Sequence, residues 1–324
     1  MTHAIRVHET GGPEKLRWEV VEVGKPGAGE VRLRHTAIGV DYADIYYRTG
    51  VYPTALPIVP GHEAVGIVEE VGAGVNDVSI GDRVAYVTQE IGAYAETRLM
   101  PSRHLIKLPS GISDNEAAAI ILKGMTVRYL VRETYDVKAN DVVLVHAAAG
   151  GVGLILCQWL KHLGATVIGT VSNEHKAALA KANGCAYTID YTREDFVQRV
   201  RDLTDGRKVP VVYDSIGKDT FTRSLDCLAP EGLMVVFGHT SGKVTPFDLM
   251  LLATKGSLYV TRPTLWSRLK NKEDLISRAN EVFSKVSEGT VRITIGQTYP
   301  LREAPRAHMD LESRKTIGTT ILSV

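Results

Sequence analysis

The stretch from residue 41 to residue 63 holds the side chains best suited to bind a metal ion. His62 and Glu63 are adjacent in LPIVPGHEAVG, and Asp41 lies upstream in AIGVDYADIYYRTGVYP. A catalytic Zn²⁺ takes about three protein ligands and keeps one open position. The upstream stretch has no cysteine, and a carboxylate with one histidine makes a poorer zinc site than thiolate ligands do. We therefore expect no metal, with His62 and Glu63 acting through hydrogen bonds. A zinc site made by Asp41, His62 and Glu63 stays open as the alternative.

The same upstream stretch is rich in tyrosine, with Tyr42, Tyr46, Tyr47 and Tyr52 close together. A tyrosine ring packs well against a flat conjugated substrate, and its hydroxyl is a modest acid. Tyr46 and Tyr52 flank an Arg-Thr-Gly turn. Together with Asp41, they are the candidate catalytic residues.

A glycine-rich loop, HAAAGGVG, spans residues 146–153 between the apolar stretch DVVLV and the helical pattern LILCQWLKHLG. Ala147, Gly150 and Gly153 give an A-x-x-G-x-x-G spacing. Glycines let backbone N–H groups approach phosphates, and a helix N-terminus adds favourable partial charge. The loop therefore predicts a site for the pyrophosphate of a dinucleotide.

The residues after the second expected strand indicate which dinucleotide binds. NAD-binding folds place an acid about 20 residues beyond the glycines, where it bonds the ribose 2′-hydroxyl. Here Ser172 stands at that place and Lys176 follows. Both suit a 2′-phosphate, which a carboxylate would repel. Glu174 is compatible with a 2′-phosphate only if its side chain points to solvent. On Ser172 and Lys176, the sequence favours NADP over NAD.

The elements needed to position these residues follow from the pattern of the chain. Residues 1–110 are strand-rich, and SDNE at 113–116 has capping-box spacing before an Ala-rich helix. From about 140 to 265, six strands alternate with helices, which is typical of a doubly wound parallel sheet. Elements after about 270 are expected to return to the first domain.

Bulk properties exclude several classes of protein. The chain has 324 residues, a formal net charge of +1 and three widely spaced cysteines. Balanced charge argues against nucleic acid, and no apolar run reaches the length of about 20 residues that a membrane helix needs. No disulfide framework or signal peptide is expected, so the predicted location is cytoplasmic.

Motifs over nearly the whole chain, in order, resemble the quinone oxidoreductases of the medium-chain dehydrogenase/reductase superfamily, in its zeta-crystallin-like branch. The matching motifs are AIGVDYADIYYRTGVYP, GHEAVGIVEEVG, GDRVAY, LKGMTVRYL, HAAAGGVGLILCQW, VVYDSIG, GLMVVFG, GSLYVTRP and LESRKTIG. The resemblance implies an α/β protein with a Rossmann domain at 122–265 and a GroES-like catalytic domain made of 1–121 and 266–324. Asp41 and His62 depart from the residues usual in the quinone branch.

The resemblance also implies NADPH as the cofactor and assigns its contacts. Lys176, Tyr191 and Arg314 would contact the 2′-phosphate. Other positions would line the pyrophosphate or approach the rest of the cofactor: Thr126, Tyr129, Ala149, Gly150, Gly151, Val152, Gly153, Ser172, Gly238, Ser241 and Arg262.

The function expected from this resemblance is NADPH-dependent reduction of a quinone without metal. Three alternatives remain: an NADPH-dependent enoyl or enone reductase, a zinc-dependent alcohol or sugar dehydrogenase, and a non-enzymatic NADPH-binding protein. GSLYVTRP should form the last, edge strand of the sheet, where two copies could pair. A homodimer is therefore expected.

Overall fold

The computed structural model describes residues 1–324, and the chain divides into two compact units. The first unit consists of Met1–Met125, Trp266–Gly289 and Ile293–Val324. The second consists of Thr126–Leu265 and Thr290–Arg292. The chain thus enters the second unit at Thr126, returns to the first at Trp266, and adds three more residues, Thr290–Arg292, to the second unit.

The second unit is built on a six-stranded sheet with the order β10-β9-β8-β11-β12-β13, in which every pair is parallel. Numbered from the first strand of the unit, this is the 3-2-1-4-5-6 order of a dinucleotide-binding fold. The doubly wound sheet expected from the sequence is confirmed. Its strands are β8 (Val142–Val145), β9 (Thr166–Val171), β10 (Cys185–Asp190), β11 (Val209–Asp214), β12 (Leu228–Val236) and β13 (Tyr259–Thr261).

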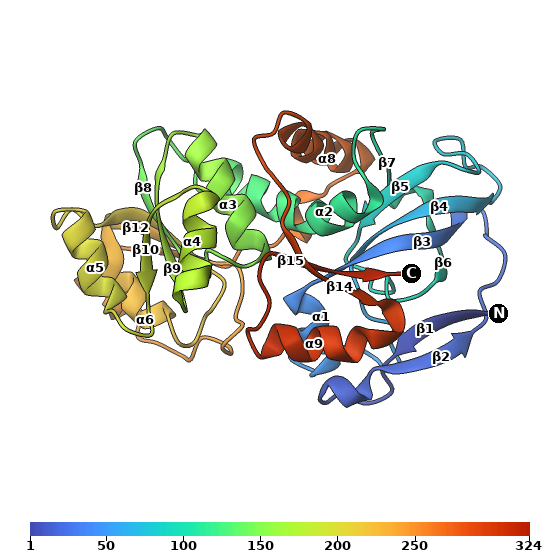
Figure 1. Cartoon of the computed structure of the whole chain (residues 1–324), viewed down its shortest axis with the longest axis horizontal. Coiled ribbons are helices and arrows are strands. Elements are labelled where there is room, and N and C mark those ends of the chain that lie inside the picture. Colours follow the sequence, from blue (N-terminus) through green and yellow to red (C-terminus); the bar gives the residue numbers. More distant parts are fainter. The chain divides into compact units, whose positions relative to one another are not determined.

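Helices cover both faces of this sheet, with α3 and α4 on one side and α5 and α6 on the other (Figure 1). Leu144, Ile168 and Met234 are fully buried beneath them, which explains why the central strands are mainly apolar. Gly164 ends α3 in the left-handed conformation, at φ +85°. The helices are α3 (Gly151–His162), α4 (Glu174–Ala182), α5 (Phe196–Leu203), α6 (Phe221–Ser224) and α7 (Met250–Thr254).

The first unit contains a seven-stranded sheet whose main path is β14-β15-β3-β4-β5-β7, with β6 paired to β3. The first two strands of the chain, β1 and β2, form a separate antiparallel pair. The last two strands of the chain join this sheet. The strands are β1 (Thr2–Arg6), β2 (Arg17–Val21), β3 (Glu30–Val40), β4 (Glu63–Val71), β5 (Arg83–Val87), β6 (Thr97–Pro101), β7 (Leu105–Lys107), β14 (Ile295–Pro300) and β15 (Thr319–Ser323).

Four helices accompany this sheet: α1 (Tyr42–Arg48), α2 (Asp114–Tyr129), α8 (Lys272–Ser287) and α9 (Ala304–Glu312). The capping box predicted before α2 is confirmed. The Ser113 N–H donates to Glu116 Oε2 at 2.9 Å, and the Glu116 N–H donates to Ser113 Oγ at 3.3 Å. Because both orphan groups are satisfied, the helix start is fixed just ahead of the residues that line the candidate site.

All three cysteines are free and buried. Cys157 and Cys185, which are distant in the sequence, bring their sulfur atoms within 3.4 Å of one another. No helix in the structure combines the length and apolar character that crossing a bilayer requires.

Candidate active site

The glycine-rich loop connects β8 to α3, with Gly150 as the residue that caps the helix. Ala147 takes a positive φ of 52°, and the Gly150 N–H donates to its carbonyl at 3.0 Å. A Cβ on Gly153 would lie 2.3 Å from that carbonyl oxygen, so no side chain fits there. The loop therefore leaves the N–H groups of the first turn of α3 open to an anion.

The other predicted cofactor residues of the second unit follow the carboxyl ends of its strands. Ser172 follows β9, and Tyr191 follows β10. Gly238 and Ser241 follow β12, and Arg262 follows β13. Ligands of doubly wound sheets bind at this edge.

The residues around α4 bear on the choice of NADP. Asn173 caps the helix by accepting from the Lys176 N–H at 2.9 Å, so Lys176 lies in the first turn. The Glu174 side chain is 89% exposed and lies 3.4 Å from Arg193. Glu174 therefore points to solvent, as an NADP site here requires.

The loops after β11 and β12 support one another. The Ser241 hydroxyl donates to the Ile216 carbonyl at 2.9 Å and accepts from the Asp219 N–H at 3.0 Å. A Cβ on Gly238 would lie 2.6 Å from the Ser215 carbonyl oxygen. Contacts between the two loops thus explain why position 238 is glycine and position 241 is serine. Contact of Gly238 and Ser241 with a cofactor stays a prediction.

The remaining cofactor predictions are spread over several elements. Thr126 and Tyr129 lie in α2, where Tyr129 is 3% exposed and so offers little surface to a ligand. The Arg262 guanidinium donates to the Val236 carbonyl at 3.1 Å. Arg314 follows α9 in the first unit with a positive φ of 59°. Its contact with a 2′-phosphate remains a prediction.

Lys123 lies at the centre of the first unit's candidate site and was not among the residues predicted from the sequence. Its ammonium nitrogen is 2.8 Å from Asp41 Oδ1 and 2.8 Å from Glu63 Oε1. The Leu122 N–H donates to the other Glu63 oxygen at 2.7 Å. Lys123 is 4% exposed and Glu63 is fully buried. A lysine ammonium therefore occupies the space between the carboxylates considered as metal ligands.

The protonation states of this cluster follow from burial and proximity. Burial raises the pKa of Glu63 well above its usual range. Burial also favours neutral Asp41, but the Lys123 ammonium opposes it and holds the pKa of Asp41 below its usual value. The two carboxyl groups outweigh burial at Lys123 and raise the pKa of its amine. Asp41 is thus the ionised partner of the Lys123 ammonium, and Glu63 is the less acidic of the two carboxyl groups.

The zinc alternative does not fit these residues. Asp41 and Glu63 are already bonded to an ammonium group, and no cluster of three or more His, Cys, Asp and Glu side chains is arranged to hold a metal ion. A divalent cation in the same place would meet the positive charge of Lys123.

His62 acts through a hydrogen bond, as the sequence suggested. Its Nδ1 donates to the Thr88 carbonyl at 2.9 Å, which leaves Nε2 as the unprotonated nitrogen of the neutral ring. Burial lowers the pKa of His62, so the ring stays neutral near pH 7. This bond ties the start of β4 to the end of β5.

The predicted tyrosines form an aromatic cluster with His62. Tyr46 and Tyr52 meet edge to face at 5.1 Å between ring centroids, and Tyr47 meets Tyr52 at 5.5 Å. The Tyr47 and His62 ring centroids are 5.3 Å apart, and those of His62 and Trp266 are 5.4 Å apart. Tyr46 is 7% exposed, whereas Tyr52 is half-buried. The structure therefore brings both candidate tyrosines into one cluster.

A buried hydrogen-bond network fixes the helix that carries Tyr46. The Tyr94 hydroxyl donates to Asp44 at 3.0 Å and lies 3.0 Å from His308 Nε2. Arg48 donates to His308 Nδ1 at 3.2 Å and to Glu312 at 2.6 Å. Burial and Asp41 raise the pKa of Asp44 to about 7, and burial and Arg48 lower that of His308 to about 3. The network links α1 to α9.

Comparisons with known proteins place the chain among oxidoreductases. Residues 27–110 match the family described as the alcohol dehydrogenase GroES-like domain, and residues 151–277 match the one described as zinc-binding dehydrogenase.

Three relatives match the chain over nearly its full length. A quinone oxidoreductase of Pseudomonas aeruginosa is 50% identical over 323 residues, 99% of each chain. A 2-haloacrylate reductase of a Burkholderia species is 47% identical over 329 residues, again 99% of each. The crystal structure of Escherichia coli quinone oxidoreductase complexed with NADPH superposes with a TM-score of 0.97 at 46% identity, covering 100% of both chains.

Proposed function

Because the chain belongs to the quinone oxidoreductases of the medium-chain dehydrogenase/reductase superfamily, we propose that it is a zinc-independent NADPH:quinone oxidoreductase. The observation that carries the zinc-independent part is the Lys123 ammonium, 2.8 Å from both Asp41 and Glu63. NADPH, when bound, supplies the reducing electrons.

A quinone needs no Lewis acid to accept these electrons, unlike an alkoxide-forming reaction that a metal must support. Its carbonyls are already electrophilic, and reduction makes the ring aromatic. What remains for the protein is to bind and orient the acceptor and to exclude water. The tyrosine cluster suits this role, since its rings pack against a flat acceptor and its hydroxyl groups can donate hydrogen bonds.

The cofactor roles are proposed residue by residue. The N–H groups at 149–153 bind the pyrophosphate, while Lys176, Tyr191 and Arg314 bind the 2′-phosphate. Two features support this division: the open helix N-terminus at Gly150 and the outward direction of Glu174. A cationic pair at the 2′-position favours NADPH over NADH.

The test uses purified protein treated with a chelator. We would follow oxidation of NADPH and, in parallel, of NADH with an ortho-quinone such as phenanthrenequinone as acceptor. Rapid oxidation of NADPH and slow oxidation of NADH is the expected result. Activity that appears only after zinc and an alcohol are supplied would overturn the proposal. Binding of NADPH without turnover of any acceptor would favour a non-enzymatic protein.

A second acceptor class is favoured by one relative. The 47%-identical protein from Burkholderia is named for reducing a 2-haloacrylate, which is an unsaturated carboxylate. Reduction of a C=C bond beside a carbonyl also needs no zinc. Turnover of quinones and of conjugated enoates, measured side by side, distinguishes the two activities.

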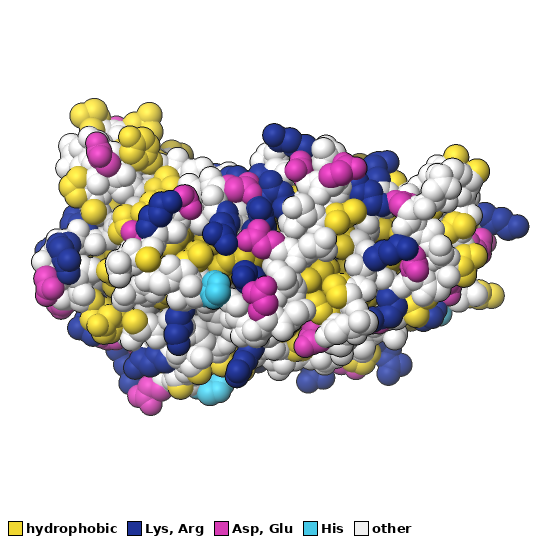
Figure 2. Space-filling view, turned by 90° about the horizontal axis from the view of Figure 1, so that it is seen from above, with side chains coloured by type: hydrophobic (Ala, Val, Ile, Leu, Met, Phe, Trp, Pro, Cys, Tyr) yellow, Lys and Arg dark blue, Asp and Glu magenta, His cyan; other side chains and the backbone are white.

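The protein is further proposed to be a cytoplasmic homodimer. Strand β13 is an edge of the sheet, and Tyr259 and Val260 on it are 60% and 36% exposed. Pairing of this edge with its copy would cover them. Three reduced cysteines suit the cytoplasm. Acidic and basic side chains are interspersed on the face in Figure 2, which argues against a nucleic-acid partner. Sedimentation should give the mass of two chains, and Tyr259→Asp should halve it.

A further inference from the structure

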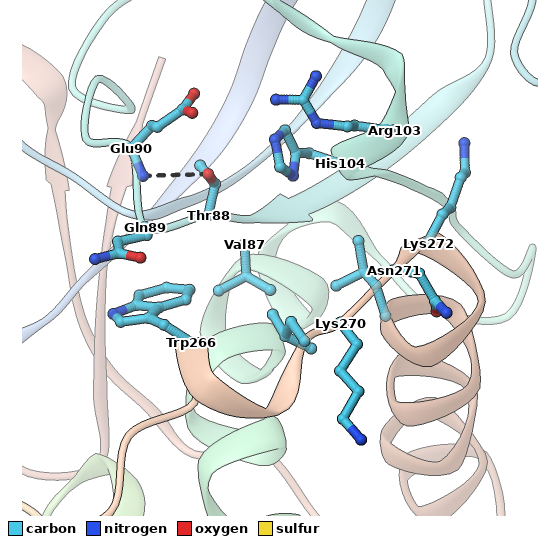
Figure 3. Close-up of a pocket in the computed structure, with 12 residues that line it drawn as sticks. Val87, Thr88, Gln89, Glu90, Arg103, His104, Trp266, Lys270, Asn271 and Lys272 are labelled. Atoms are coloured by element: carbon cyan, nitrogen blue, oxygen red, sulfur yellow. Dashed lines mark hydrogen bonds between the residues drawn. The ribbon is translucent and has the colours of Figure 1, made fainter.

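A pocket of about 510 Å³ lies in the first unit, and Trp266, whose ring contacts His62, is one of the residues that line it. None of the predicted catalytic or cofactor residues lines it. Its volume falls within the range of about 300–1,000 Å³ typical of small-molecule sites. It is therefore large enough for an organic ligand of its own (Figure 3).

The floor of the pocket is apolar and includes one large aromatic side chain. Val87 at the end of β5 is 1% exposed, and Leu275 in α8 is 3% exposed. Trp266, in the short 3-10 helix Trp266–Arg268, is half-buried and forms one wall. A planar ring or conjugated body could pack against the indole and these aliphatic groups.

The rim of the pocket is cationic. Arg103 and Lys270 are exposed and form no ion pair within the chain. Lys272, by contrast, is bonded to Asp77 and to the Ser102 carbonyl. The one carboxylate on the rim, Glu90, lies across the pocket from Lys270 in Figure 3. The positive charges of Arg103 and Lys270 therefore favour binding of an anion in the pocket.

A buried polar atom in the wall lacks a partner. His104 Nε2 is shielded from solvent and has no hydrogen-bond partner in the chain. Burial and the adjacent Arg103 lower the pKa of His104, which keeps the ring neutral. An uncompensated buried nitrogen costs stability unless a ligand or water bonds it. His104 is therefore a polar group of the wall whose hydrogen-bonding capacity the chain itself leaves unused.

We propose that this pocket binds a planar carboxylate, an aromatic or conjugated acid whose body packs against Trp266 and whose negative charge is attracted by Arg103 and Lys270 on opposite sides of the rim. Trp266 also packs against His62, and Thr88 both lines the pocket and accepts the His62 hydrogen bond. Occupancy of the pocket is thus transmitted to the tyrosine cluster through His62. The carboxylate belongs either to an acidic acceptor or to a separate effector.

The test is calorimetric titration of the full-length protein with naphthoate, and with the uncharged naphthamide for comparison. Naphthoate should bind more tightly than naphthamide, and its affinity should fall as salt is raised. The double variant Arg103→Glu/Lys270→Glu should weaken naphthoate binding about tenfold or more, equivalent to the loss of about 1.4 kcal/mol. Lys25→Glu, which reverses an exposed charge in the loop before β3, should leave binding unchanged.

Steady-state kinetics distinguish the two sources of the carboxylate. If the pocket holds the acid group of the acceptor, the double variant raises KM for a carboxylated naphthoquinone and not for the uncharged quinone. If an effector binds, naphthoate changes turnover of the uncharged quinone without competing with it. Equal binding of naphthoate and naphthamide, or equal binding by wild type and double variant, would overturn the proposal. Quinone turnover would survive either failure, so the two proposals are tested separately.

Discussion

Lys123 Nζ lies 2.8 Å from Glu63 Oε1, with both side chains shielded from solvent, and the same nitrogen lies 2.8 Å from Asp41. Lys123→Met would remove the cation and leave an ionised Asp41, whose side chain is only 13% exposed, without its partner. Breaking a buried ion pair in this way typically costs about 3–5 kcal/mol. Urea unfolding should show a loss of free energy of this size.

Two further variants identify the group responsible. Lys107→Met breaks the exposed pair with Asp82 and should cost about 1 kcal/mol or less. Adding Asp41→Asn to Lys123→Met should restore more stability than adding Glu63→Gln, because Asp41 is the ionised carboxyl. Equal restoration by both would mean that the charge is shared by the two groups.

Asp44 should make the protein less stable as the pH rises through neutrality. Burial and then Asp41 raise the pKa of Asp44 from 3.8 to about 7 in the folded protein. The folded state therefore holds a proton that the unfolded chain has released between these values. The contribution of Asp44 is greatest below pH 3.8 and is lost as the pH rises through about 7.

Asp44→Asn isolates this effect from the other titrating groups. Asparagine can still accept the Asp41 N–H and the Tyr94 hydroxyl, so the hydrogen bonds of Asp44 are retained. The difference in unfolding free energy between variant and wild type, measured from pH 5 to pH 8, should grow in favour of the variant. A difference that stays constant with pH would show that Asp44 does not titrate in this range.

The phosphate loop should not tolerate a side chain at Gly153. A Cβ there would lie 2.3 Å from the Ala147 carbonyl oxygen and 2.8 Å from the Ala148 carbonyl, so the backbone must move. Gly153→Ala should therefore weaken NADPH binding about tenfold or more, measured by fluorescence titration. Gly111→Ala, at a position with nothing within 4 Å of an added Cβ, is the matched control and should bind NADPH normally. Unchanged binding by Gly153→Ala would remove the loop from the cofactor site.

Much of the fold was predictable because its signals are local. Strand β8 of the second unit is apolar throughout, as a strand covered on both faces must be, and Ser113 and Glu116 make a capping box that four residues encode. Lys123 was harder to interpret. A single lysine within the apolar stretch AAAIILKGM signals a buried charge that needs a partner. The sequence around Lys123 does not indicate that Asp41 and Glu63 are its partners, because β4 and α2 meet only in the folded chain. The packing of Trp266 on His62 depends in the same way on a contact between distant segments.

Preference for NADPH should depend on Lys176, which lies in the first turn of α4. Lys176→Glu would place a carboxylate where the proposed 2′-phosphate binds, so KM for NADPH should rise about tenfold or more while KM for NADH changes little. Lys181→Glu, an exposed position in the last turn of the same helix, controls for net charge. If both variants affected the two cofactors equally, the 2′-phosphate site would have to lie elsewhere.

Tyr52 should matter for the acceptor and not for the cofactor. Its ring packs against Tyr46 at 5.1 Å and Tyr47 at 5.5 Å, and it is the more exposed of the two candidate tyrosines. Tyr52→Ala should lower kcat/KM for the quinone about tenfold or more and leave the Kd for NADPH unchanged. Tyr187→Ala, which removes an exposed tyrosine from β10, should change neither constant.

Tyr52→Phe then separates the two functions of the side chain. Phenylalanine keeps the ring and loses the hydroxyl, so near-normal turnover would assign Tyr52 to packing against the acceptor. Turnover as low as that of Tyr52→Ala would assign it to hydrogen bonding or proton donation, and the loss should then vary with pH. Equal losses of quinone turnover and NADPH affinity in Tyr52→Ala would contradict both roles, because a residue that contacts only the acceptor cannot weaken cofactor binding in the free enzyme.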